Sequence, residues 1–117
     1  MVSWREREAR NEVGFRNRNE WIQTTTESFG PELLTAFVCE CGDGDCVQTI
    51  ELTSIEYELV RSTSNRFALA IDHENPESES VVCEYPRFAM VDKIEGWGLR
   101  LSRETDPRGA RPSAEES

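Results

Sequence analysis

The first thirty residues of the chain predict one long helix with a single narrow apolar face. Phe15, Ile22 and Phe29 recur at seven-residue spacing among mostly charged residues, which is the repeat of one stripe on an α-helix. We expect the helix over residues 4–28, because the pair Gly30-Pro31 ends it. One narrow stripe buries little surface, so this charged helix is marginal alone, and its stripe is expected to pack either on this domain or on another protein, in which case the helix becomes ordered on binding.

Alternating apolar and polar residues predict short strands and one helix in the middle of the chain. Leu33–Val38 and Val47–Leu52 flank a turn rich in glycine, aspartate and cysteine. We expect them to pair as a β-hairpin with that turn at its tip. Thr53 and Glu56 have the spacing of a capping box, which opens a helix. Further strands are expected at Arg66–Ile71, Val81–Tyr85 and Phe88–Lys93.

These elements indicate an α+β fold in which the chain has three parts. The charged helix occupies residues 1–30, and the short β-hairpins and the capped helix form a small zinc-binding domain over residues 31–95. From residue 96 the periodic pattern fades, and the last residues are rich in Ser, Pro, Arg and Glu. Such a composition buries too little apolar surface to fold, so residues 96–117 are expected to be a disordered tail.

Charge is distributed unevenly along the 117 residues, of which 37% are apolar and whose net charge is −10. Residues 31–95 contain fourteen acidic and four basic residues, whereas both flanking segments are neutral. An acidic surface repels nucleic acid and anionic membranes, so both are disfavoured as partners, with the arginines of the first twenty residues as a local exception. The charge favours solubility and also suits a basic protein partner.

Cysteine usage points to metal binding in a cytoplasmic protein. The N-terminus lacks the apolar stretch of a secretory signal, and no segment is apolar over a length that spans a membrane. We therefore expect the protein to be cytoplasmic. Disulfides are rare in that compartment, so four cysteines in a short chain indicate a metal site rather than covalent cross-links.

Three cysteines have a spacing that suits one metal ion. Cys39, Cys41 and Cys46 form a C-x-C-x4-C pattern in which the intervening glycines tolerate a tight turn. Zinc binds four thiolate or imidazole ligands in a tetrahedron. The fourth ligand is expected to be His73, the single histidine, with Cys83 as the alternative. Free thiols without metal are disfavoured, because three clustered exposed thiols oxidise readily.

The fourth ligand also decides whether the zinc is structural or catalytic. Four protein ligands close the site, whereas a catalytic zinc keeps one position for water. Asp72 and Glu74 flank His73. Three roles fit these two carboxylates: a catalytic acid or base, an acceptor for the imidazole N–H, or plain solvated side chains. The sequence lacks the signatures of zinc deaminases, phosphate-binding loops, serine hydrolases and His-Glu-x-x-His metalloproteases. A structural zinc is therefore favoured.

Several segments between about residues 10 and 93 together form a recognisable pattern. They are Phe15-Arg16, Asn19-Glu20, Phe37–Asp43, Cys46, Glu51–Thr53, Tyr57, Val60-Arg61, Arg66-Phe67, His73-Glu74 and Val81-Val82. This pattern resembles a family of small, mostly uncharacterised actinobacterial proteins. The resemblance implies a zinc site of the three cysteines and the histidine, and so favours His73 over Cys83; it implies no particular activity. Family members usually have glycine before the His-Glu pair, where this chain has Asp72.

Two functions are consistent with this sequence. The first is a regulatory protein–protein interaction module, in transcription or signalling, whose zinc is structural and whose partner is another protein. Trp4, Trp21 and Trp97 lie near the chain ends, where aromatic residues outside a core typically anchor interfaces; alternatively, Trp21 and Trp97 close the core. The second is a small zinc-dependent hydrolase with an open metal position. The missing catalytic motifs favour the module over the enzyme.

Overall fold

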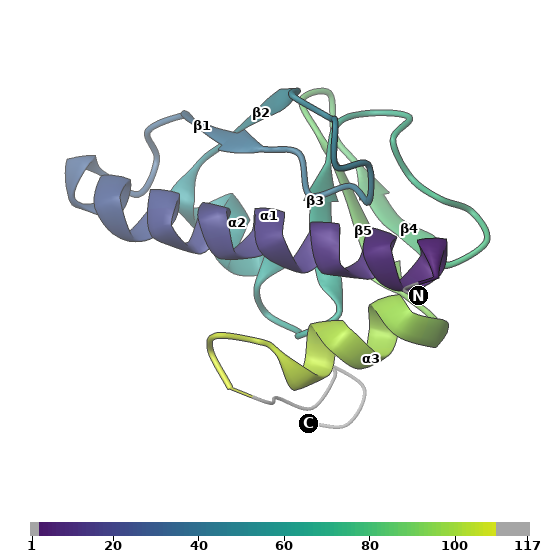
Figure 1. Cartoon of the computed structure of the whole chain (residues 1–117). Helices are drawn as coiled ribbons and strands as arrows, with labels where there is room; N and C mark the ends of the chain where they lie inside the picture. Colours follow the sequence, from purple (N-terminus) through teal and green to yellow (C-terminus); the bar gives the residue numbers. More distant parts are fainter. Residues whose placement is uncertain (1–2, 110–117) are drawn as a thin grey trace.

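The computed structural model describes residues 3–109 and shows an α+β fold (Figure 1). Its helices are α1 (Trp4–Thr26), the short 3-10 helix η1 (Glu27–Phe29), α2 (Ser54–Val60) and α3 (Gly96–Glu104). Its strands are β1 (Thr35–Val38), β2 (Thr49–Leu52), β3 (Arg66–Leu69), β4 (Glu79–Glu84) and β5 (Ala89–Lys93). In the described part of the chain, no helix combines the length and the apolar character needed to cross a membrane.

Two small antiparallel sheets form the β part of the fold. β1 pairs with β2, with Thr35 opposite Leu52, and this confirms the predicted hairpin with the cysteine turn at its tip. In the second sheet β5 lies between β3 and β4. The predicted capping box is also confirmed, because Thr53 and Glu56 each accept the other's backbone N–H at the start of α2.

The apolar core lies between the two sheets and α2. The rings of Phe37 on β1 and Tyr57 on α2 stack with their centroids 4.7 Å apart. The other large buried apolar side chains are Ile50, Leu52, Val60, Phe67, Leu69, Phe88, Met90 and Val91. Strand residues that alternate along β2, and nearly all of β3 and β5, supply most of this core.

Helix α1 packs on this core through a face that is mostly polar. Its buried residues recur at three- and four-residue spacing and are Ala9, Glu12, Arg16, Asn19 and Gln23. The predicted apolar stripe is not the centre of this face: Phe15 and Ile22 are only half-buried, although Ile22 packs against the core, and Phe29 is 72% exposed. The structure therefore differs from the expectation of a helix that is ordered by a partner, because α1 rests on the chain's own strands and on α3 (Figure 1).

Each buried polar residue of α1 has specific partners. Asn19 pairs with both backbone groups of Val38, accepting its N–H and donating to its carbonyl, both at 2.8 Å. The guanidinium of Arg16 donates to the carbonyls of Ser64 at 2.8 Å and of Ser102 at 3.1 Å. Buried polar groups cost free energy unless they are paired. These contacts therefore fix the position of α1 along the strands.

The segment after residue 95 differs from the predicted tail. Gly96–Glu104 forms helix α3, which lies beside α1 (Figure 1). Beyond it, Asp106 is buried and pairs with Arg61 and with the hydroxyl of Ser64. The composition of this segment concealed its order, because besides the buried Leu101 the segment is held by polar contacts to distant residues. The rest of the predicted tail, residues 110–117, lies outside the described residues.

We expect Asn19→Ala to destabilise the protein by roughly 2–4 kcal/mol, because it leaves the Val38 amide and carbonyl without their side-chain partner and removes one of the three donors to the buried Glu40 carboxylate. Urea unfolding of the full chain measures this change. The matched control is Asn17→Ala, on the exposed side of the same helix, which should change the free energy of unfolding by less than about 0.5 kcal/mol. Equal effects of the two substitutions would contradict the role given to Asn19.

Candidate metal centre

Three cysteines and one histidine meet at the tip of the β1–β2 hairpin. The Sγ atoms of Cys39, Cys41 and Cys46 and a ring nitrogen of His73 all lie within 4.8 Å of one another. The His73 Nδ1 atom is 3.5 Å from the sulfur of Cys39 and 3.7 Å from that of Cys46. The cysteines come from the turn between β1 and β2, and His73 comes from the turn after β3.

Two of these distances match those of a tetrahedral metal site. With metal–sulfur bonds of about 2.3 Å and metal–nitrogen bonds of about 2.0 Å, neighbouring sulfur and nitrogen ligands lie about 3.5 Å apart. The two sulfur–nitrogen distances, 3.5 Å and 3.7 Å, are close to that value. Four protein ligand atoms therefore already surround a position that one metal ion can occupy.

The backbone around the cluster holds the ligands in this arrangement. The Cys39 N–H donates to the Gln48 carbonyl at 3.1 Å, which closes the hairpin beneath the turn. His73 follows a turn in which its N–H donates to the Ala70 carbonyl. Asp72, inside that turn, has a φ of 71°. This is a left-handed conformation that aspartate tolerates better than most residues and that glycine adopts freely.

The sequence analysis missed Glu40, which lies between two of the cysteines and is fully buried. Its carboxylate accepts hydrogen bonds from Asn19 at 2.9 Å, from the hydroxyl of Tyr57 at 2.7 Å and from the N–H of Ala68 at 2.9 Å. Burial raises the pKa of Glu40 although these donors oppose the shift. Glu40 thus anchors the C-x-C segment to α1, α2 and β3. Its only sequence signal is a charged residue at an alternating position within a strand-like run.

The sulfur atoms influence one another's protonation. A hydrogen bond from Cys41 lowers the pKa of the Cys39 thiol, and the same bond raises the pKa of Cys41. Burial raises the pKa of the Cys46 thiol. The N–H of Ala70 also donates to the Cys39 sulfur at 3.1 Å. Three thiolates at such short range repel one another, and a divalent cation between them would offset that repulsion.

Cys83, the alternative fourth ligand, lies away from this cluster. It is opposite Met90 in the β4–β5 pair, and its side chain is hydrogen-bonded to Tyr85. Within residues 3–109, the group of potential metal ligands contains the three cysteines of the turn and His73, but not Cys83. Of the two sequence alternatives, the structure therefore brings His73 to the cysteines.

A pocket of about 410 Å³ opens beside the cluster, between α1 and the turn before β4. Its lining residues are Glu8, Glu12, Cys41, Gly42, Asp43, His73, Asn75 and Glu79. Glu12 and Glu79 form buried ion pairs with Lys93. Burial raises the pKa of Glu12 to about 8, even though Lys93 favours the charged form. The two glutamates contributed by α1, Glu8 and Glu12, were not among the predicted site residues.

Gly42 is required by contact with α1 rather than by its backbone conformation. A Cβ atom at Gly42 would lie 1.9 Å from the Glu8 side chain. Asn11 donates to the Gly42 carbonyl at 2.9 Å, so the first half of α1 closes over the cysteine turn. Among the described glycines, a positive φ occurs at Gly30, Gly96 and Gly109 only. The expected conformational role of the glycines in this turn is therefore replaced by one of close packing.

Gly42→Ala should destabilise the protein by about 1–3 kcal/mol, because the new methyl group displaces the stem of Glu8. Combining it with Glu8→Ala should recover part of this loss. Urea unfolding of the two single variants and the double variant measures the coupling between the positions. If the two effects simply add, the contact between α1 and the turn does not determine the need for glycine.

The raised pKa of Glu12 predicts a pH dependence of stability. Between pH 4.5, the ordinary value, and about 8, the folded state keeps a proton that the unfolded state has released. The protonated Glu12 therefore contributes fully to the free energy of unfolding below pH 4.5, and this contribution is lost as the pH rises through about 8. Glu12→Gln cannot titrate, so its stability should rise relative to the parent protein across this range. Parallel unfolding free energies of the two proteins from pH 5 to pH 9 would contradict the assignment.

Comparison with known proteins identifies no relative of this chain. No protein-family model matches it, and neither a curated protein nor a solved structure does so. The resemblance to a family of small actinobacterial proteins therefore stays a prediction from the sequence. The function has to follow from the chemistry of the site itself.

Proposed function

We propose that the chain binds one structural zinc ion through Cys39, Cys41, Cys46 and His73 and serves as a small protein–protein interaction module. The observation that carries the zinc assignment is the convergence of three sulfur atoms and one imidazole nitrogen within 4.8 Å. Thiolate-rich tetrahedral sets select zinc over oxygen-preferring cations such as magnesium and calcium. The measured sulfur–nitrogen spacing supports the same assignment.

The position of the site supports a structural role for the ion. The cysteines belong to the β1–β2 hairpin, whereas His73 belongs to the turn that leaves β3 in the second sheet. One ion would therefore join the two sheets. Because four protein ligands complete the tetrahedron, no position remains for a reactive water. Such an ion contributes directly to the free energy of folding.

The interaction role draws its support from the exposed surface. Trp21 is 67% exposed and Phe29 is 72% exposed, and both lie at the C-terminal end of the α1–η1 segment. Large aromatic side chains outside a core are typical anchors of protein interfaces. A regulatory role, in transcription or signalling, fits a small domain that combines a structural metal with such a surface.

A zinc-dependent hydrolase is the second candidate, and the pocket beside the cluster favours it. Cys41 and His73 both line that pocket, and so does Glu12, whose pKa of about 8 allows it to hold a proton near neutral pH. This reaction class requires a water on the metal in place of one protein ligand. X-ray absorption of the zinc-loaded protein separates the two: three sulfurs and one nitrogen support the module, and an oxygen ligand supports the hydrolase.

Purified protein should contain one equivalent of zinc, and removing it with a chelator should unfold the domain. Zinc-finger peptides gain roughly 10–16 kcal/mol of apparent free energy from the metal, which exceeds the stability of most small domains. Elemental analysis and circular dichroism before and after chelation measure both effects. Protein that folds with well under one equivalent of zinc would refute the structural assignment.

The fourth ligand has its own test. His73→Ala should lose zinc to a competing chelator much faster than Cys83→Ser does, because only His73 lies in the cluster. Cys83→Ser is the matched control, since it removes a thiol from a strand outside the site. If Cys83→Ser loses zinc and His73→Ala retains it, the ligand set is wrong.

A further inference from the structure

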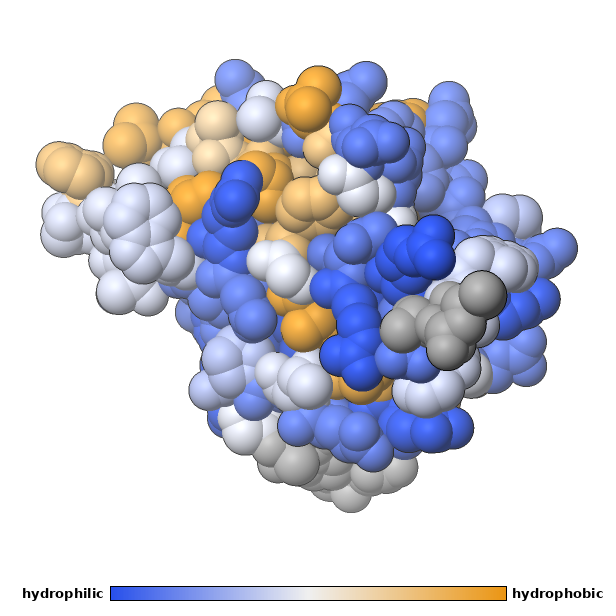
Figure 2. All heavy atoms as spheres, in the orientation of Figure 1, coloured by the Kyte–Doolittle hydropathy of each residue, from blue (hydrophilic) through white to orange (hydrophobic). Residues whose placement is uncertain are grey.

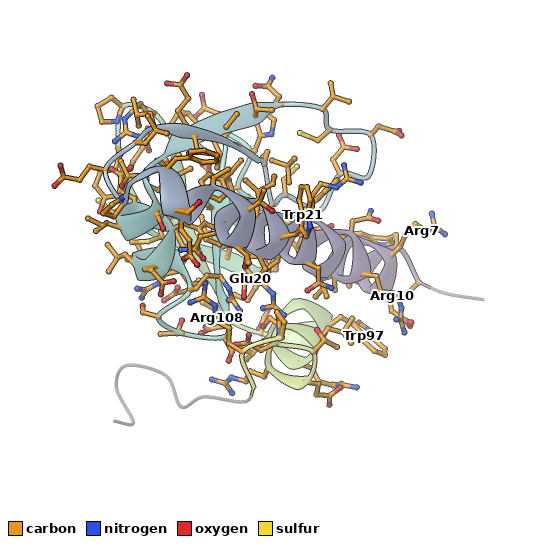
Figure 3. The ribbon with its side chains drawn as sticks, turned by 90° about the vertical axis from the view of Figure 1, so that its left-hand side faces the viewer. Arg7, Arg10, Glu20, Trp21, Trp97 and Arg108 are labelled. Carbon is orange, nitrogen blue, oxygen red and sulfur yellow. The ribbon has the colours of Figure 1, made fainter. Side chains whose placement is uncertain are left out.

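The outer face of α1 has a composition unlike the rest of the molecule. Opposite the buried polar face, five exposed residues recur at three- and four-residue spacing: Arg7, Arg10, Gly14, Arg18 and Trp21. Arg7 and Arg10 project from α1 away from the sheets, and Trp21 lies farther along the same helix (Figure 3). We call these five residues the outer face. It carries three positive charges and no negative charge on a chain of net charge −10.

The arginines of the outer face are poorly neutralised by the chain itself. Arg10 pairs with Glu6, one helical turn earlier. Arg7 and Arg18 have no ion pair or hydrogen bond in the described part of the chain. Arg108, by contrast, forms a two-pronged contact with Glu20 at 2.8 Å, and the two side chains lie side by side in Figure 3. The unpaired guanidiniums leave this face with a local positive potential.

Neither close packing nor backbone conformation requires glycine at position 14, in the middle of the outer face. A Cβ atom there would have no atom within 4 Å, and its φ is not positive. Glycine inside a helix costs about 1 kcal/mol relative to alanine. Gly14 lines a hollow of about 230 Å³ between α1 and α3. The lining of this hollow is Arg10, Val13, Gly14, Asn17, Leu101 and Thr105.

The hollow and the charges are followed by apolar surface. Leu33 and Leu34 are about half exposed and Phe29 more so, and they follow α1 in the chain. Figure 2 shows apolar side chains gathered where α1 runs into η1 and β1, and hydrophilic ones along much of the rest of this side. The surface thus offers cationic groups, a side-chain-sized hollow and an apolar end.

We infer that the outer face of α1 is a docking surface for an acidic, amphipathic helical segment of another protein. Acidic side chains of the partner would pair with Arg7, Arg10 and Arg18, where charge complementarity is available. One apolar side chain would enter the hollow at Gly14, and further ones would contact Trp21. The inference rests on the proposed interaction role and does not require the zinc ion to be the contact.

The same charges argue against nucleic acid as the partner. The three arginines lie on one helix, and residues 31–95 of the same domain contain fourteen acidic and four basic residues. Phosphate chains extend beyond one helix face and would meet that negative surface. A short acidic helix covers only the outer face and avoids it.

The test is a selection of random peptides of about sixteen residues, roughly four helical turns, on the full zinc-loaded chain. Recovered peptides should be acidic with spaced apolar residues. Their Kd, measured by fluorescence anisotropy, should rise by about tenfold or more for Gly14→Leu, which fills the hollow, and for Arg7→Glu combined with Arg18→Glu. Gly14→Leu should keep or raise the Tm, because leucine is the better helix former. Loss of binding without loss of stability is thus specific to docking.

Arg103→Glu is the matched control, since it changes the same charge on an exposed residue of α3 outside the hollow; its Kd should stay within about twofold of the parent value. The inference is overturned by peptides that lack acidic residues, by peptides that bind all variants equally, or by a selection without binders. It is also overturned if oligo-dT or phosphatidylserine vesicles bind the outer face and acidic peptides do not.

Zinc content is measured on every sample, so that the two proposals can fail separately. Normal zinc content without peptide binding refutes only the docking surface, and peptide binding without zinc refutes only the metal assignment.

Discussion

The docking of α1 through buried polar side chains is the constraint on which the rest of the structure depends. Arg16, Asn19 and Gln23 each contact groups from a different part of the chain, and Glu12 is paired with Lys93 inside the fold. Burying such groups gives little net stability, since the loss of hydration offsets much of the attraction. These groups instead constrain the position of the helix, because a shift of α1 by one residue would leave several buried donors and acceptors unpaired. The polar face therefore determines where α1 lies more strictly than an apolar stripe would.

The candidate metal centre depends on this interface. Asn19 holds the backbone of Val38 and the carboxylate of Glu40, on either side of Cys39. Asn11 and Glu8, about two and three turns earlier on the helix, close over the cysteine turn at Gly42. A metal ion at the cluster would thus connect not only the two sheets but also, through these contacts, the long helix. Ligand geometry and helix position support each other, so the fold itself preorganises the site.

The two faces of α1 differ in what they contribute to the fold. The polar groups of the inner face hold the helix in the fold. The arginines and Trp21 of the outer face are not needed for this packing. A surface whose residues do not support the core can change without unfolding the protein, which is what a binding surface needs. Under the proposed docking, Gly14 has a physical reason: glycine lowers helix stability, and at this position it leaves the hollow between α1 and α3 open to a partner side chain.

The sequence by itself determined the features that depend on local physics. Period-two alternation located the hairpins, the spacing of Thr53 and Glu56 located α2, and ligand chemistry singled out the three cysteines together with His73 or Cys83. Tertiary structure decided which of those two residues meets the cysteines, which face of α1 is buried, and that Gly96–Glu104 is a helix. Polar residues at helical spacing are indistinguishable from a solvated face until their partners are known. For Arg16 these partners are backbone carbonyls 48 and 86 residues away, groups that every residue carries and that no sequence pattern marks.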